Sequence, residues 1–140
     1  MTLTEQEPLL GSLTEQIFRL SAPYNNQFQG IATRLLFVCS VGLLRSPTAA
    51  DQATLLGYNT RSCGSDSRYA LIPLSVNLIA WADKIIFINQ ENYREAVVNF
   101  EDSEWLATMK HKAVIWNIED DYERNDHWLI KVIQDKLNEL

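Results

Sequence analysis

The fold is decided by one stretch of the sequence, residues 35–47, which reads LLFVCSVGLLRSP. Its first four residues, 35–38, are all apolar and predict a short β-strand that is buried on both faces. The pair Ser46-Pro47 marks the start of a helix, because proline is well tolerated in the first helical turn. A strand, a tight loop and a helix in this order predict the first unit of a parallel α/β sheet.

Strand and helix patterns continue to alternate along the chain. We expect strands at 58–62, 85–88 and 113–117, and helices at 47–56, 74–82, 91–100 and from about Asp126 onward. Short apolar strands separated by helices imply a parallel sheet covered on both faces. Ligands of such sheets bind beyond the carboxyl ends of the strands, where Cys39, Ser62 to Ser65, Asn89 and Asp120 are expected to meet.

The loop after the first strand carries the groups that are needed to attack a phosphate ester. Its backbone N–H groups and the helix dipole can hold a tetrahedral oxyanion and favour the thiolate form of Cys39, the candidate nucleophile. Arg45 offers a planar fork for two phosphoryl oxygens, and Ser46 can donate a hydrogen bond to the sulfur. The structural alternative is a small buried cysteine beside an unrelated arginine. The backbone of the loop would bind the substrate through Ser40, Val41, Gly42, Leu43 and Leu44, with Gly42 suited to a positive φ.

Residues 37–47 resemble the phosphate loop of the low-molecular-weight protein tyrosine phosphatases, whose usual form is Val-Cys-x-Gly-Asn-x-Cys-Arg-Ser-Pro. Further pieces similar to the family follow in its order at 60–65, 81–88 and 119–122, so that the resemblance covers residues 31–140. It implies a three-layer α/β/α fold with a four-stranded parallel sheet in the order 2-1-3-4. It also implies hydrolysis of phosphomonoesters, above all protein phosphotyrosine, through a cysteinyl-phosphate intermediate on Cys39.

The resemblance also implies roles for residues outside the loop. Asp120 takes the first position of the family's Asp-Pro motif and is the candidate general acid, with Asp121 as its rival. Tyr122 is a candidate wall of the substrate pocket, and Ser62 is similar to the serine that braces the phosphate loop. The structural alternatives are a solvated acidic loop at 119–121 and a plain turn serine at 62.

Three residues of the loop depart from the family pattern. Val41 stands where glycine is usual, Gly42 where the family has a bracing asparagine, and Leu44 where many members have a second cysteine. The other cysteine of this chain, Cys63, is expected to be a small packed residue. The alternative is that it approaches Cys39 closely enough to form a regulatory disulfide.

Two further functions stay open from the sequence. One is a thiol-dependent arsenate reductase, although members that relay oxidation internally need more cysteines than this chain has. The other is an inactive relative that binds phosphate groups for protein interaction. No cofactor is implied, and His111 and His127 lack the spacing of metal ligands, so we expect no metal.

Composition and charge limit the partners. The chain of 140 residues has a net charge of −6, yet residues 31–90 carry more basic than acidic side chains. This distribution favours a local phosphate site and argues against nucleic acid as a partner. The sequence has no 18-residue apolar stretch and no basic flank at its N-terminus, which argues against a membrane span and a secretory signal. The expected partners are therefore a phosphorylated protein or a small phosphomonoester, and a free thiolate favours the cytoplasm.

The chain is expected to divide into residues 31–140, a phosphatase-like domain, and residues 1–30, an N-terminal extension. Residues 12–15 read Ser-Leu-Thr-Glu, a capping-box pattern, and Leu13, Ile17 and Leu20 follow at helical spacing. We therefore expect a short helix in the extension.

Overall fold

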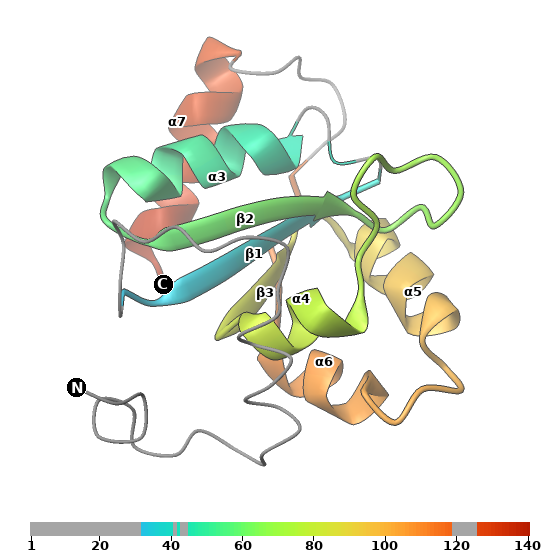
Figure 1. The fold of residues 1–140 in the computed structure, drawn as a ribbon. Helices are drawn as coiled ribbons and strands as arrows, with labels where there is room; N and C mark the ends of the chain where they lie inside the picture. Colours follow the sequence, from blue (N-terminus) through green and yellow to red (C-terminus); the bar gives the residue numbers. More distant parts are fainter. Residues whose placement is uncertain (1–31, 41, 43–44, 119–125) are drawn as a thin grey trace, which may run out of the picture.

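The computed structural model describes residues 32–40, 42, 45–118 and 126–140. These residues alternate between strands and helices in the way that the sequence predicts (Figure 1). In chain order the elements are β1 (Arg34–Cys39), α3 (Arg45–Leu55), β2 (Asn59–Gly64), α4 (Val76–Trp81), β3 (Lys84–Phe87), α5 (Gln90–Asn99), α6 (Leu106–Lys112), β4 (Ala113–Ile115) and α7 (His127–Asn138).

The four strands form one parallel sheet in the order β2-β1-β3-β4, which confirms the predicted topology. In the register of the sheet, Cys39 at the end of β1 lies beside Gly64 at the end of β2. Phe37 of β1 lies beside Ile86 of β3 on its other side. The phosphate loop therefore leaves the sheet from a central strand, with neighbouring chain on both sides.

Helices cover both faces of the sheet, so the predicted three layers are present (Figure 1). Leu35 and Phe37 of β1 pack on the side of α3 and α7, and Leu36 and Val38 pack on the side of α4, α5 and α6. All four side chains are fully buried. Alternate residues of a strand point to opposite faces, and this is why the run at 35–38 is apolar without a break.

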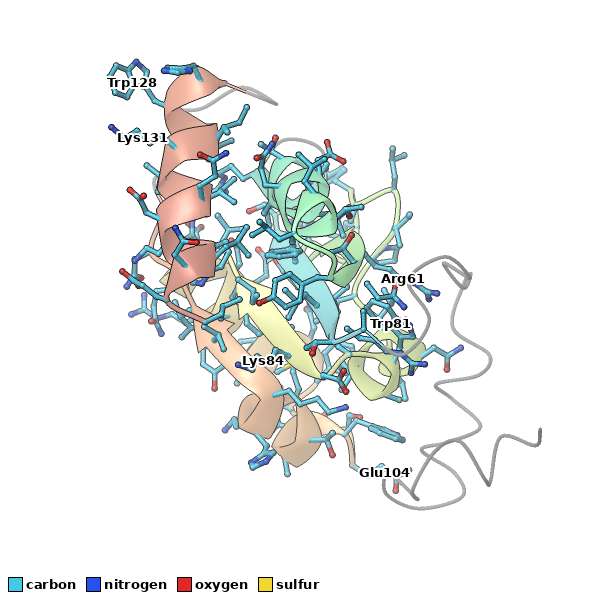
Figure 2. The ribbon with its side chains drawn as sticks, turned by 90° about the vertical axis from the view of Figure 1, so that its left-hand side faces the viewer. Arg61, Trp81, Lys84, Glu104, Trp128 and Lys131 are labelled. Atoms are coloured by element: carbon cyan, nitrogen blue, oxygen red, sulfur yellow. The ribbon has the colours of Figure 1, made fainter. Side chains whose placement is uncertain are left out.

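The core on the side of α4 also holds a charged residue. Arg61 of β2 is only 4% exposed, and its guanidinium lies 4.4 Å from the ring centroid of the fully buried Trp81 (Figure 2). A guanidinium over an indole face gains electrostatic attraction from the ring. This contact joins β2 to α4 within the layer that supports one side of the site.

Several boundaries differ from the sequence-based expectations. Helix α3 begins at Arg45, two residues before the expected start, so that Arg45 and Ser46 lie in its first turn. Strand β2 runs to Gly64 instead of ending at residue 62. Helix α6 was not predicted, because Met109 is its only buried residue and a single apolar position gives no periodic signal.

The N-terminal extension, with its expected helix, lies outside the described residues, and the proposed division of the chain at residue 30 remains a prediction. Among the helices that the structure describes, none is long and apolar enough to cross a membrane.

Candidate active site

Cys39 and Ser46 face each other across the start of α3. The Sγ of Cys39, at the end of β1, lies 3.0 Å from the Oγ of Ser46. Both residues are buried, and the serine hydroxyl also reaches the carbonyl of Cys63 at 3.4 Å. The sequence-based expectation that Ser46 contacts the sulfur is thus met in the geometry. A hydroxyl at this distance can stabilise a thiolate by hydrogen bonding.

Gly42 holds the middle of the loop against the neighbouring strand. Its φ is +77°, in the region that glycine adopts without strain, as the sequence predicts. A Cβ at this position would lie 3.0 Å from the carbonyl carbon of Cys63 and 3.2 Å from the nitrogen of Gly64. The close approach of the two backbones therefore requires glycine. Val41, Leu43 and Leu44, the other predicted phosphate-binding positions between Ser40 and Arg45, lie outside the described residues.

Backbone from the loop after β2 supports the start of the phosphate loop. The N–H of Ser65 donates to the carbonyl of Cys39 at 2.8 Å, and the N–H of Asp66 donates to the carbonyl of Ser40 at 2.8 Å. These two bonds continue the pairing of β1 with β2 past the ends of both strands. They fix the backbone at the nucleophile and at the residue after it.

Arg45 connects the phosphate loop to the chain that follows β4. It is only 3% exposed, and its Nη1 donates to the carbonyl of Ile118 at 3.0 Å. Ile118 is itself held by a backbone bond to the carbonyl of Ile88, after β3. The structure thus brings the segments after β1, β3 and β4 together, as expected from the parallel sheet. Asp120, Asp121 and Tyr122 lie outside the described residues.

The bracing role expected for Ser62 stays a prediction. Ser62 pairs with Phe37 inside the sheet, two residues before the end of β2, and the backbone N–H of Ser65 donates to the carbonyl of Cys39. Residues 41, 43 and 44 of the loop lie outside the described residues.

Cys63 packs on the opposite face of the sheet from Cys39. It is 1% exposed and belongs to the core beneath α4, whereas Cys39 belongs to the core beneath α3. Both thiols are free, and burial raises the pKa of the Cys63 thiol, with the nearby Cys39 adding to this effect. The structure supports the expectation of a small packed residue and does not support a disulfide partner for Cys39.

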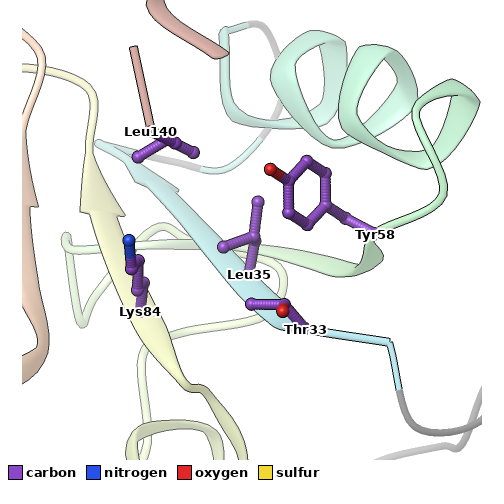
Figure 3. A pocket seen from close by; sticks show the side chains of 5 residues that line it. All are labelled: Thr33, Leu35, Tyr58, Lys84 and Leu140. Atoms are coloured by element: carbon purple, nitrogen blue, oxygen red, sulfur yellow. The ribbon is translucent and has the colours of Figure 1, made fainter. Parts of the chain in front are cut away.

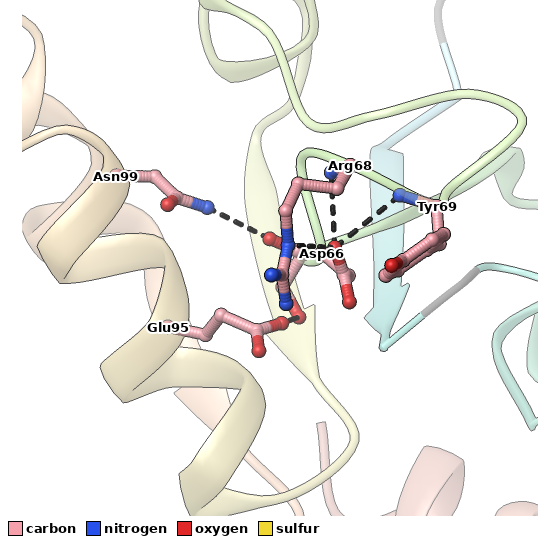
Figure 4. Close-up of polar contacts among 6 residues, drawn as sticks. Asp66, Arg68, Tyr69, Glu95 and Asn99 are labelled. Carbon is pink, nitrogen blue, oxygen red and sulfur yellow. Dashed lines mark hydrogen bonds and ion pairs between the residues drawn. The ribbon is translucent and has the colours of Figure 1, made fainter.

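Helix α5 contributes polar residues that sequence reasoning missed. Asn92, which is 1% exposed, donates from Nδ2 to the Oγ of Ser40 at 3.1 Å. One turn further, Glu95 accepts a hydrogen bond of 2.6 Å from the Oγ of Ser65, and Asn99 donates to the carbonyl of Ser65 at 2.8 Å (Figure 4). The spacing 92, 95 and 99 places these side chains on one face of the helix. This regular spacing of polar residues was the only sequence pattern that could have indicated a polar face of the helix turned toward the site.

The segment after Ser65 is shaped by Asp66. Its Oδ1 accepts from the backbone N–H groups of Arg68 at 2.9 Å and Tyr69 at 3.3 Å (Figure 4). A carboxylate that accepts from the backbone two and three residues ahead stabilises a turn. Tyr69, in this turn, is largely exposed and lies four residues after Ser65.

A hollow of about 220 Å³ lies at the other end of the sheet (Figure 3). It is lined by residues at the starts of β1, β2 and β3 and at the C-terminus: Thr33, Leu35, Tyr58, Lys84 and Leu140. Because the amino ends of parallel strands lie opposite their carboxyl ends, this hollow is separate from Cys39. In the part of the chain that the structure describes, no cluster of three or more His, Cys, Asp or Glu side chains could hold a metal.

No protein-family model and no curated protein matches this sequence. Several solved structures are similar to its fold. Wzb from Vibrio vulnificus in complex with benzylphosphonate has a TM-score of 0.57 at 14% identity, covering 78% of this chain and 99% of Wzb. The low-molecular-weight protein tyrosine phosphatase SP-PTP from Streptococcus pyogenes has a TM-score of 0.58 at 15% identity, with coverage of 77% and 93%.

The arginine phosphatase YwlE from Geobacillus stearothermophilus has a TM-score of 0.55 at 19% identity, covering 76% of this chain and 94% of YwlE. The similarity covers nearly the whole length of each of these three proteins. Together with the strand order and the central position of the Cys39 loop, they show that this chain has the fold of the low-molecular-weight protein tyrosine phosphatases.

Proposed function

We propose that this protein hydrolyses phosphomonoesters by cysteine-dependent catalysis. The observation that carries the proposal is the position of Cys39 at the end of the central strand β1. Its sulfur lies 3.0 Å from a buried serine hydroxyl in the first turn of α3. The N-terminus of an 11-residue helix favours a bound phosphate. Arg45 in the same turn adds a fixed positive charge.

The proposed reaction has two steps. In the first, the Cys39 thiolate attacks phosphorus, an S–P bond forms, and the P–O bond to the leaving group breaks. Asp120 donates a proton to the leaving oxygen. In the second, the Asp120 carboxylate takes a proton from water as the water oxygen attacks phosphorus, the S–P bond breaks, and the Cys39 thiolate and inorganic phosphate are released.

The proposed role of Asp120 is supported by chain connectivity. Ile118 is bonded to Arg45. Asp120 follows Ile118 by only two residues in the sequence. Asp121, one residue further, is the second candidate acid, and Tyr122 is proposed to line the substrate pocket.

The proposed substrate class is protein phosphotyrosine. SP-PTP is described as a tyrosine phosphatase, and so is Wzb from Escherichia coli K30, a further similar structure, whereas YwlE is described as an arginine phosphatase. Phosphoarginine is therefore the competing substrate for the same loop. A thiolate nucleophile also needs a reducing environment, which supports the cytoplasm as the proposed location.

The proposal is tested by turnover of an aryl phosphate. Wild-type protein should release phosphate from p-nitrophenyl phosphate, Cys39→Ser should release none, and Arg45→Lys should be slower and bind phosphate more weakly. The Cys39→Ser variant should still bind inorganic phosphate in a calorimetric titration. Appreciable hydrolysis by Cys39→Ser would exclude the covalent mechanism.

Other outcomes assign the alternatives. Phosphate binding without any turnover of phosphotyrosine or phosphoarginine would identify an inactive phosphate-binding module. Reduction of arsenate with added thiol, in the absence of phosphatase activity, would identify a reductase.

A further inference from the structure

The phosphate loop of this chain is braced by a residue from another element. Asn92 lies in the first turn of α5, which begins three residues after the end of β3. Its side chain uses both ends: Nδ2 donates to the Oγ of Ser40 at 3.1 Å, and Oδ1 accepts from the N–H of Asn89 at 3.2 Å. Asn92 is only 1% exposed, and Ser40 is half-buried. A buried amide with both ends bonded has one favoured orientation.

This chain needs such a brace because Gly42 supplies none. The position that resembles the family's bracing asparagine holds a glycine, whose only contribution is close backbone packing against Cys63 and Gly64. Ser40 directly follows the nucleophile. A bond to its hydroxyl therefore acts on the backbone where the phosphate-binding N–H groups begin.

We propose that Asn92 is a positioning residue that holds the phosphate loop in its anion-binding conformation through Ser40. This inference rests on the proposed function and goes beyond it, because it assigns the organisation of the loop to α5. Two further residues of α5 fix the helix against the segment after β2. Glu95 and Asn99 tie it to Ser65, whose own N–H is bonded to the carbonyl of Cys39.

The test is a double-mutant cycle with Ser40→Ala, Asn92→Ala and the double variant. The readout is protection of Cys39 from iodoacetamide by inorganic phosphate, which measures anion binding and does not need turnover. Each single variant should weaken phosphate binding by about three- to tenfold, the range of one hydrogen bond. The double variant should be no weaker than the more affected single variant, because both substitutions remove the same bond.

The control for a general loss of helix capping is Ser75→Ala. Ser75 caps α4, since its Oγ accepts from the N–H of Leu78 at 3.3 Å, and it makes no bond to Asn92 or Ser40. Ser75→Ala should therefore lower the free energy of unfolding in urea by about 1 kcal/mol and leave phosphate protection unchanged. This separates loop positioning from a loss of helix stability.

A second pair of substitutions covers the case in which Asn92→Ala does not fold. Ser40→Thr keeps the hydroxyl that accepts from Asn92 and Ser40→Ala removes it, so phosphate protection should stay near wild type in Ser40→Thr and weaken in Ser40→Ala. Equal protection in these two variants would overturn the positioning role. Additive losses of Ser40→Ala and the Asn92 variant, or protection equal to wild type in both, would overturn the positioning role and leave the phosphatase proposal standing. Absence of phosphate protection in the wild-type protein would instead overturn the proposed function itself.

Discussion

At the scale of single residues, Gly42 and Gly57 show two different reasons why a position needs glycine: close packing and a positive φ. Both have a positive φ, +77° and +94°, but a Cβ at Gly42 would meet the backbone of β2 at 3.0 Å while a Cβ at Gly57 would meet nothing within 4 Å. Gly57→Ala should therefore cost about 1 kcal/mol from backbone strain alone. Gly42→Ala should cost a further 1–3 kcal/mol or so, because the loop must move away from the strand.

Urea unfolding of the two variants measures this difference directly. Phosphate binding should weaken in Gly42→Ala and stay at the wild-type level in Gly57→Ala, since Gly57 lies in the turn after α3 and far in sequence from the loop. Equal unfolding free energies for the two variants would show that Gly42 is not closely packed against Cys63.

The two cysteines should differ in reactivity. Cys63 is buried on the opposite face of the sheet from Cys39, and burial raises its pKa, so little thiolate forms at neutral pH. Under native conditions iodoacetamide should modify Cys39 and leave Cys63 unmodified, whereas both should react in urea. Peptide mapping by mass spectrometry distinguishes the sites. A linked Cys39–Cys63 peptide pair after mild peroxide treatment would contradict the placement of the two sulfurs on opposite faces.

At the scale of elements, the closing helix α7 depends on Asp126, the residue that caps its N-terminus. The Oδ1 of Asp126 accepts from the N–H groups of Trp128 at 2.9 Å and Leu129 at 3.4 Å, and Leu129 begins the buried face of the helix. Asp126→Ala should lower the free energy of unfolding by about 1 kcal/mol, and Asp126→Asn by less. Asp135, an exposed residue in the same helix, gives the control. If Asp135→Ala lowered the free energy of unfolding by a similar amount, the loss in Asp126→Ala could not be assigned to helix capping.

How well the sequence predicts an element follows from how much of it is buried. Strands β1 and β3 were predicted because both faces of the sheet are covered, which requires unbroken apolar runs. Helix α6 could not be predicted from one buried residue, Met109. In the candidate site, the sequence predicts Cys39, Arg45 and Ser46 because their chemistry is confined to one short stretch. The sequence also placed Ser65 near the site, within the segment from Ser62 to Ser65, but Asn92 was missed because its contact depends on the placement of α5.

At the scale of the whole molecule, the parallel sheet assembles the site from distant segments. Ser65 bonds to Cys39, Asn92 to Ser40, and Arg45 to Ile118, so the ends of all four strands contribute. Each bond crosses between elements, and the site therefore forms only when the sheet is complete. The proposed phosphate site is compatible with a net charge of −6, because the anion would be held by backbone N–H groups and one arginine, not by overall charge.

The same assembly predicts where the proton for the leaving group comes from. The bond from Arg45 to Ile118 ties the beginning of the acidic segment to the phosphate loop, and Asp120 follows two residues later. Asp120→Ala should lower the rate by about 10²-fold or more with phenyl phosphate, whose leaving group needs a proton. The loss should be far smaller with 2,4-dinitrophenyl phosphate, because its leaving group departs unprotonated. Asp121→Ala is the matched control and should lose less. The opposite order would assign the acid to Asp121, and equal, small losses in both would place the proton donor outside this segment.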